Sequence, residues 1–94
     1  MYLLRIEHTV LDFEAWKKMF DGDPVDRRGS GVVRYRISRA VDDPNLVTGD
    51  LEFTNRDDAE KLHAKLKDLW AGPAAAMTRN PTARVVEVVD EASL

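Results

Sequence analysis

The two histidines are the side chains of this sequence best suited to move protons, because imidazole titrates near neutral pH. His8 lies near the end of an alternating apolar segment, and His63 lies at the edge of an apolar helical stripe. We predict that His8 acts as a general base; a histidine bonded to a backbone carbonyl is the structural alternative. His63 is the weaker candidate, either a ligand contact or an ordinary residue at the boundary of the core.

Three aromatic side chains could assist such a base. The phenol of Tyr35 can donate a hydrogen bond to an enolate oxygen, so we predict that it stabilises a developing oxyanion. Trp16 and Trp70 fall on the apolar stripes of two helical patterns, where they would stack on a flat ligand or simply fill the core. For Tyr35 the alternative is a hydrogen bond to a backbone carbonyl.

The sequence gives little support to metal, cofactor or thiol chemistry. It has no cysteine, which excludes disulfides, thiolate metal sites and cysteine nucleophiles. Zinc sites generally need about three or four protein ligands, and two histidines without metal-binding spacing do not supply them. Arg27, Arg28 and Gly29-Ser30-Gly31 do not match a phosphate-binding loop, so we expect a flexible turn with solvated arginines. We predict neither a metal nor a cofactor.

Composition narrows the classes of partner. The chain has 94 residues and a mass of 10.6 kDa, which predicts one domain over residues 1–94. Its 14 basic and 17 acidic residues are mixed along the sequence, so no basic stripe is present to bind nucleic acid. No apolar run approaches the ~20 residues that span a bilayer, and the first residues do not resemble a signal peptide. We expect a cytoplasmic protein without a nucleic-acid or membrane partner.

Apolar periodicity predicts six elements in the order βαββαβ. Asp12 is expected to cap the first helix, Gly22 to end it in the left-handed conformation, and Thr54 to cap the second helix. The pattern predicts strands at Tyr2–Val10, Val32–Ala40, Leu46–Phe53 and Ala83–Val89, and helices from Phe13 to Phe20 and between Thr54 and Gly72.

This order predicts a four-stranded antiparallel sheet with both helices on one face, an α+β fold. The helix-facing side is expected to carry the apolar set Leu4, Ile6, His8, Tyr35, Ile37, Leu51 and Phe53. The helix-free side is expected to carry Arg5, Glu7, Arg34, Arg36, Asp50 and Glu52, with Leu3 and Val32 between them.

We predict that two copies pair through the helix-free face as a homodimer, because a domain this small gains stability by burying more apolar surface. A solvated face is the alternative, since an antiparallel sheet needs only one covered side. Asp50 is expected to pair with Arg34 or Arg36 there; a register slip of one residue would move Asp50 to the helix side.

The chain also resembles a known superfamily. The βαββαβ order, the opening Ile6-Glu7-His8-Thr9-Val10 and the following Asp12-Phe13-x-x-Trp16-Lys17-x-x-Phe20-Asp21 are similar to the ferredoxin-like, dimeric α+β barrel proteins, near the antibiotic-biosynthesis monooxygenases and cyclases. The resemblance covers nearly the whole chain and implies a homodimer with a pocket between sheet and helices. The residues that would line that pocket are His8, Trp16, Tyr35, His63, Trp70 and Met77.

The chain departs from the haem-degrading members of that superfamily. Their axial histidine follows the second long helix. The matching stretch here, residues 72–80, contains no histidine, and Met77 is the only side chain in it that resembles an axial ligand. Their asparagine on the first strand is missing too, since the strand offers Glu7 and His8. The resemblance therefore implies chemistry without haem.

Two functions follow as expectations. The first is a homodimeric pocket protein that acts on an aromatic or polyketide-like metabolite as a cofactor-independent monooxygenase or cyclase. The second is a non-catalytic dimeric binding module, and the sequence does not decide between them. A cavity of ~300 Å³ or more lined by His8 and Tyr35 would favour the first, and a packed core would favour the second.

Overall fold

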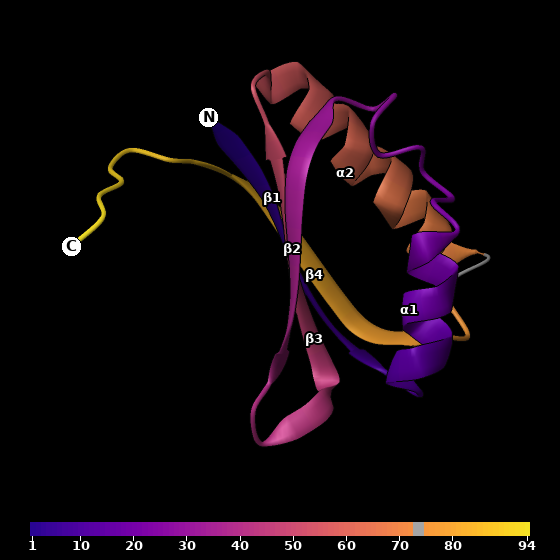
Figure 1. Cartoon of the computed structure of the whole chain (residues 1–94). Helices are drawn as coiled ribbons and strands as arrows, with labels where there is room; N and C mark the ends of the chain where they lie inside the picture. The colour runs from indigo at the N-terminus through magenta and orange to yellow at the C-terminus, as the bar shows by residue number, and fades with distance from the viewer. Residues whose placement is uncertain (73–74) are drawn as a thin grey trace.

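The structure is a computed structural model that describes residues 1–72 and 75–94. Its elements follow the predicted order βαββαβ. Figure 1 shows the sheet edge-on, with both helices on one side of it. The elements are β1 (Tyr2–Val10), α1 (Phe13–Asp21), β2 (Val32–Ala40), β3 (Asp43–Phe53), α2 (Arg56–Ala71) and β4 (Thr78–Glu87).

The sheet has the strand order β2-β3-β1-β4, and each neighbouring pair is antiparallel. β1 is central and runs beside β3 from Tyr2, opposite Phe53, to Thr9, opposite Leu46. Each helix therefore connects two parallel strands that have a third strand between them, as expected for paired right-handed βαβ units. This register places Arg5 opposite Asp50, so the acid lies on the helix-free face as predicted. Its ion pair is with Arg5 of the neighbouring strand β1 and not with Arg34 or Arg36, so that part of the prediction is wrong.

A β-bulge in β2 reverses one of the predicted orientations. Val32 pairs with Phe53 and Arg34 with Glu52, which leaves Val33 as an extra residue between two register positions. Because a bulge shifts the alternation of side chains by one residue, Val32 packs on the core under the helices. The prediction that Val32 lies on the helix-free face is wrong.

Two strands are longer than the sequence predicts. β3 begins at Asp43 rather than Leu46, and β4 begins at Thr78 rather than Ala83 and ends at Glu87. The early part of β4 contains Asn80, whose φ of 50° falls in the left-handed region, next to a register shift against β1. β4 is an edge strand, where a residue without an amide N–H, such as Pro81, is tolerated.

Both helices begin with an oxygen-bearing side chain that accepts backbone amides. Asp12 accepts from the amides of Glu14 at 3.0 Å and Ala15 at 3.4 Å, as predicted. The cap of α2 is Asn55 rather than Thr54, one residue later than expected. Gly22 ends α1 with a φ of −67°, so the predicted left-handed glycine is also wrong. The predicted stop at Gly72-Pro73 falls partly outside the described residues.

The two helices pack on the sheet differently. Ala59 and Leu62 of α2 are buried against Leu4, Leu51 and Phe53 in the larger core cluster. Trp16 of α1 packs against Val10 and Val47 in a smaller cluster. The backbone of α2 comes close to three strands, whereas that of α1 stays farther from the sheet and large side chains fill the distance.

Candidate functional site

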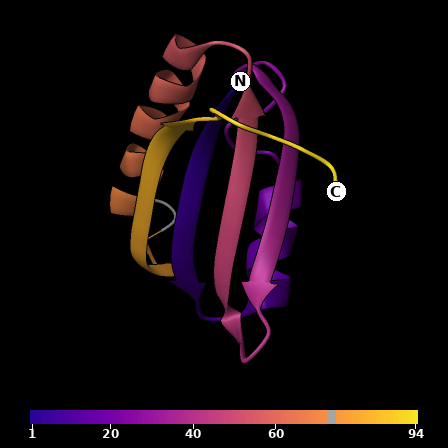
Figure 2. The ribbon, with the colours of Figure 1, turned by 90° about the vertical axis from the view of Figure 1, so that its left-hand side faces the viewer.

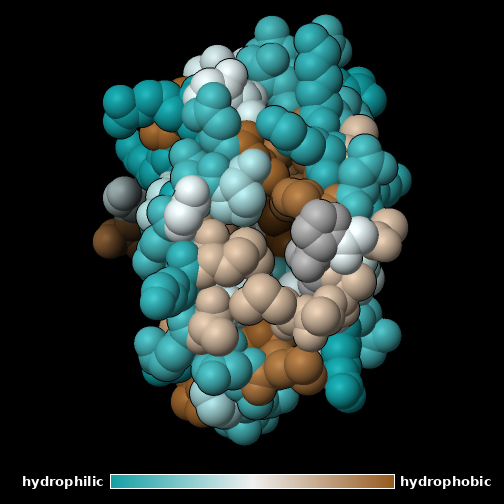
Figure 3. Space-filling model, turned by 90° about the vertical axis from the view of Figure 1, so that its right-hand side faces the viewer, coloured by the Kyte–Doolittle hydropathy of each residue, from teal (hydrophilic) through white to brown (hydrophobic). Residues whose placement is uncertain are grey.

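A cavity of about 170 Å³ lies between the sheet and the helices. Its floor includes Ile6, Ile37 and Gly49 from three neighbouring strands, and both helices contribute to its walls. In the space-filling view from the helix side, a hollow with apolar atoms at its base opens between the helices (Figure 3). The cavity exists because α1 stands away from the sheet. Gly49, which has no Cβ, leaves additional space above the sheet at the floor of the cavity.

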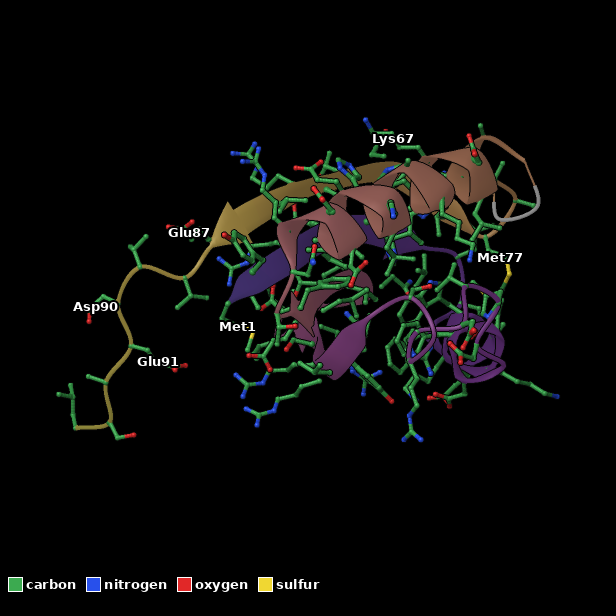
Figure 4. All side chains as sticks on the ribbon, turned by 90° about the horizontal axis from the view of Figure 1, so that it is seen from above. Met1, Lys67, Met77, Glu87, Asp90 and Glu91 are labelled. Atoms are coloured by element: carbon green, nitrogen blue, oxygen red, sulfur yellow. The ribbon has the colours of Figure 1, made fainter. Side chains whose placement is uncertain are left out.

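His8 is a buried polar residue that lines one end of the cavity. It is 5% exposed and lies near the end of β1 on the face toward the helices. Its ring meets Trp16 edge-on at 5.2 Å and Trp70 at 6.4 Å between centroids. Met77 lines the same cavity from the segment before β4, beside the end of α2 (Figure 4), and its carbonyl accepts from the amide of Leu11 at 3.4 Å. The structure therefore brings together four of the six predicted residues: His8, Trp16, Trp70 and Met77.

The electrostatic state of His8 follows from this apolar surrounding. Burial lowers the pKa of His8, because the charged imidazolium loses hydration, and the nearby dipole of its own backbone opposes this only in part. Its Nδ1 atom is buried and has no hydrogen-bond partner among the described residues. Leaving such an atom unpaired costs about 1–3 kcal/mol. A neutral imidazole with an open ring nitrogen can accept a hydrogen bond or a proton from a bound molecule.

The other two predicted residues lie outside the lining of this cavity. Tyr35 is on the helix-facing side of β2, but its ring packs edge-on against Phe20 at 5.2 Å and is 43% exposed. It belongs to the outer surface beyond Phe20 and does not lie beside His8. His63 is half-buried on α2 and does not line the cavity.

Arg27 lines the cavity, contrary to the sequence-based expectation of a solvated arginine. Its side chain is only 14% exposed, whereas Arg28 is exposed as predicted. The guanidinium lies 4.0 Å from the ring centroid of Phe20, and Nη1 donates to the carbonyl of that residue at 2.5 Å. Nε is 3.5 Å from Oδ1 of Asp23. The spacing of Asp23 and Arg27, four residues apart, is the signal that could have indicated an ordered arginine.

Two further properties concern the part of the chain that the structure describes. Within residues 1–72 and 75–94, no three His, Asp or Glu side chains come together in a way that could hold a metal ion. None of the helices in these ranges is both long and apolar enough to cross a bilayer.

The size of the cavity lies between the two outcomes expected from the sequence. The core is not fully packed, but the volume is below ~300 Å³ and Tyr35 is not in the lining. A cavity of about 150 Å³ lined by apolar side chains is known to admit benzene. This cavity is therefore large enough for a single aromatic ring, and a larger molecule would extend through the opening between the helices.

No protein-family model and no curated protein matches the chain significantly. Several solved structures do match. A variant of SnoaB, a cofactor-independent oxygenase from Streptomyces nogalater, gives a TM-score of 0.77 at 16% identity over 96% of this chain and 94% of that chain. A dimeric ferredoxin-like protein from an uncultured marine organism gives 0.68 at 14% identity, over 97% of each chain. An antibiotic biosynthesis monooxygenase gives a TM-score of 0.67 at 14% identity, over 96% of this chain and 100% of that chain.

At these identities the similarity shows the fold. The chain has the ferredoxin-like α+β fold that the sequence resemblance implied, and that prediction is confirmed. The matches cover almost the whole of this chain and of each neighbour, so the shared fold extends over nearly the entire domain.

Proposed function

We propose that this chain forms a homodimer in which each subunit binds a small, flat, largely apolar molecule in the cavity, and that it oxygenates this molecule without a cofactor. The observation that carries the proposal is the unpartnered Nδ1 of His8, a buried polar atom at the end of a largely apolar cavity. The similarity in fold to a cofactor-independent oxygenase supports the reaction class.

His8 would act as the general base in this reaction. Because burial lowers its pKa, the imidazole is neutral near pH 7 and ready to accept a proton from an acidic C–H or phenol. The resulting anion is the species that reacts with O₂. For a methylene between conjugated groups, CH₂ plus O₂ gives C=O plus H₂O, so all atoms balance without an added reductant.

The aromatic residues would hold the ring of the ligand. Trp16 and Trp70 flank His8, with ring centroids 5.2 Å and 6.4 Å from its own, and would stack on a planar molecule beside it. Met77 supplies a polarisable side chain at the same end. Tyr35 would stabilise an oxyanion only in a ligand long enough to pass Phe20, since its ring lies on the far side of that residue. The same proton removal would also support a cyclisation, in which the carbanion attacks a carbonyl of the same molecule.

Substitution of His8 is the direct test of the function. We expect His8→Phe to abolish turnover of a ligand identified by mass spectrometry of the purified protein, while the circular dichroism spectrum stays unchanged. His63→Phe is the matched control, because His63 lies outside the cavity, and it should retain activity. Equal turnover in both variants would remove His8 from the mechanism.

The homodimer part of the proposal rests on the helix-free face. Arg5 pairs with Asp50 at 2.9 Å and Arg34 with Glu52 at 3.4 Å, so several of its charges are already paired within one subunit. This pairing lowers the cost of covering the face. Residues 88–94 leave the sheet and cross in front of this face (Figure 2), where Val88 contributes to a groove.

The dimer is tested at Leu3, an apolar residue of the helix-free face. Leu3→Glu would place an unpaired acid on the face beside Glu52, and we expect it to convert the dimer to a monomer in light scattering. Val41→Glu, at the fully exposed hairpin tip, should leave the mass unchanged. A monomeric wild-type protein at working concentration would contradict the proposal.

A non-catalytic binding module is the second candidate. It is favoured by the small volume of the cavity and by the position of Tyr35 outside it, because these leave His8 without the expected partner for an oxyanion. In that case the wild type would bind the co-purified molecule and release it unchanged. Oxygen-electrode measurements with that molecule separate the two functions.

A further inference from the structure

Arg27 is held firmly in the wall of the cavity. Its Nη1 donates to the carbonyl of Phe20, its Nε lies near Asp23, and its guanidinium carbon lies over the Phe20 ring, 4.0 Å from the centroid. The Tyr35 ring centroid is 4.9 Å away, so the cation packs against two aromatic rings that also contact each other. The amide of Arg27 also donates to Asp23 Oδ1 at 2.9 Å, which fixes the loop as well as the side chain.

These contacts leave part of the guanidinium unused. An arginine carries five N–H donors, and Nη2 of Arg27 has no hydrogen-bond partner among the described residues. A cation that is 14% exposed and stacked on rings is partly dehydrated, so it gains more from an anionic oxygen than a solvated cation would. Its donors are also arranged as a fork that suits an oxyanion.

We propose that Arg27 is a ligand-binding residue that selects molecules with an ionisable oxygen, such as a phenol or enol, and binds them in the anionic form. This inference rests on the proposed function, because it requires that the cavity binds a small aromatic molecule. It adds the class of the ligand: a conjugated molecule with a phenolate or enolate oxygen.

The arrangement of the cavity wall links Arg27 to His8. The ring of His8 contacts Trp16 at 5.2 Å, Trp16 stacks on Phe20 at 5.2 Å, and Phe20 lies under Arg27. A conjugated ligand lying along this wall could lose a proton near His8 and carry the resulting charge toward an oxygen near Arg27. The wall therefore offers a base at one end and a cation at the other.

Other charged groups near Arg27 leave a net positive environment. Asp23 offsets part of its charge, but Nζ of Lys65 in α2 lies 3.3 Å from the carbonyl of Val25 in the same loop. Lys17 of α1 lies 6.0 Å from the Phe20 centroid and is paired with Asp21. His8, with its lowered pKa, is neutral near pH 7. We therefore expect the cavity to lower the pKa of a bound phenol by about 1–3 units, as an arginine does for a nearby acid.

4-Nitrophenol tests this inference, because its anion absorbs visible light and its pKa can be titrated in the bound state. Nitrobenzene, the neutral molecule of similar shape, reports on binding alone through quenching of Trp16 and Trp70, the two tryptophans of the chain. In the wild type we expect the bound phenol to have a pKa at least about one unit below its value in water.

Three variants separate charge from packing. Arg27→Met keeps a long stem over Phe20 but removes the cation, and we expect the bound pKa to rise to the value in water or above it. Arg27→Lys keeps the charge and should retain part of the decrease, which also covers the case in which the methionine variant does not fold. Arg28→Met, at the exposed neighbour, should behave as the wild type does.

The outcomes distinguish this inference from the proposed function. Binding of nitrobenzene with an unshifted bound pKa, or an equal shift in Arg27→Met, would overturn the role of Arg27 and leave the cavity as a binding site. Failure of both probes to quench tryptophan fluorescence would overturn the proposed binding function itself, and this inference with it.

Discussion

The two helices cover the same face of one sheet, but the first half of α2 closes a packed core, whereas α1 stands off the sheet and borders a cavity together with the last turns of α2. α2 presents Ala59 and Leu62 to the sheet, and these pack directly on Leu4 and Phe53. Leu4, Phe53 and Ala59 are all 0% exposed. Small or branched aliphatic side chains let the helix backbone approach the strands, so this half has few voids.

α1 presents large aromatic side chains in place of small ones. Trp16 and Phe20 stack on each other, with centroids 5.2 Å apart, and extend along the cavity rather than filling it. The floor opposite them is lowered by Gly49. Stability and binding therefore depend on different parts of one small domain: the first half of α2 closes the core, whereas α1 and the last turns of α2, with Leu66, Leu69 and Trp70, form the walls of the cavity.

The strongest test of this division is the removal of a ring from the α2 half. Phe53→Ala should lower the free energy of unfolding by about 3–5 kcal/mol, because the side chain is fully buried and its neighbours cannot fill the space. Urea denaturation followed by circular dichroism measures the change. Under conditions where the variant is folded, nitrobenzene should still bind, since Phe53 does not line the cavity. Loss of binding without loss of stability would reverse the division.

The next effect concerns the pH dependence of stability that the cavity imposes through His8. Its pKa in the folded chain is lowered by burial, whereas in the unfolded chain it has its ordinary value near about 6.5. As pH falls below that value, the unfolded state binds a proton that the folded state does not. Stability is therefore greatest above about pH 6.5 and falls by up to about 1.4 kcal/mol per pH unit until the lowered folded pKa is reached.

His8→Phe is the variant that isolates this effect. It removes the titrating group and fills much of the same volume with an apolar ring, so the decrease between pH 7 and pH 5.5 should become smaller than in the wild type. His63→Phe provides the comparison for a histidine outside the cavity. A pH profile that is the same in wild type and His8→Phe would mean that His8 is protonated as easily in the fold as in the unfolded chain.

Sequence patterns predicted the fold well because most of the relevant signals are local. Alternation gave β1 and β2 with the observed bounds, and Asp12 was identified as a cap from its position before an amphipathic run. The bulge at Val33 could not be predicted from local sequence, because it depends on how β2 pairs with Phe53 and Glu52, more than ten residues away on another strand. Val32 was therefore assigned to the wrong face.

The candidate site was predictable in part for the same reason. His8, Trp16 and Trp70 lie on regular elements, where periodicity fixes the direction of each side chain. Arg27 lies in the segment between α1 and β2, where no periodicity operates, and its burial follows from tertiary contacts with Phe20 and Tyr35. The volume of the cavity could not be predicted from the apolar periodicity either, because it depends on the distance of α1 from the sheet.

A smaller effect is expected where the two helices resemble each other, at their N-caps. Asp12→Ala and Asn55→Ala each remove an acceptor for two backbone amides, and each should cost about 1 kcal/mol. The consequences should differ: loss of the α1 cap should also weaken nitrobenzene binding, because Trp16 and Phe20 lie in the first turns after Asp12, whereas the cavity residues of α2 lie at the end of the helix opposite Asn55. Thr54→Ala is the control, since this residue does not cap α2. Equal effects of both cap variants on binding would contradict the separation of the two helices.

The smallest effect on stability, and the sharpest on binding, is expected at the cavity floor. An added Cβ at Gly49 would lie 3.2 Å from Cδ1 of Ile37, which requires that flexible side-chain end to shift by a few tenths of an ångström. Because alanine is also favoured over glycine in a strand by about 0.5–1 kcal/mol, we expect Gly49→Ala to change stability by less than about 0.5 kcal/mol.

The same methyl group would occupy space that a ligand uses. One methyl in an apolar pocket is worth about 1–3 kcal/mol, so Gly49→Ala should weaken nitrobenzene binding about tenfold or more in a tryptophan-quenching titration. Thr48→Ala is the matched control, since the neighbouring residue faces the helix-free side of the strand, and it should leave binding unchanged. Unaltered binding in Gly49→Ala would mean that the ligand lies nearer the opening between the helices than the floor. The space beneath α1 would then be a packing defect, and its volume would have no part in recognition.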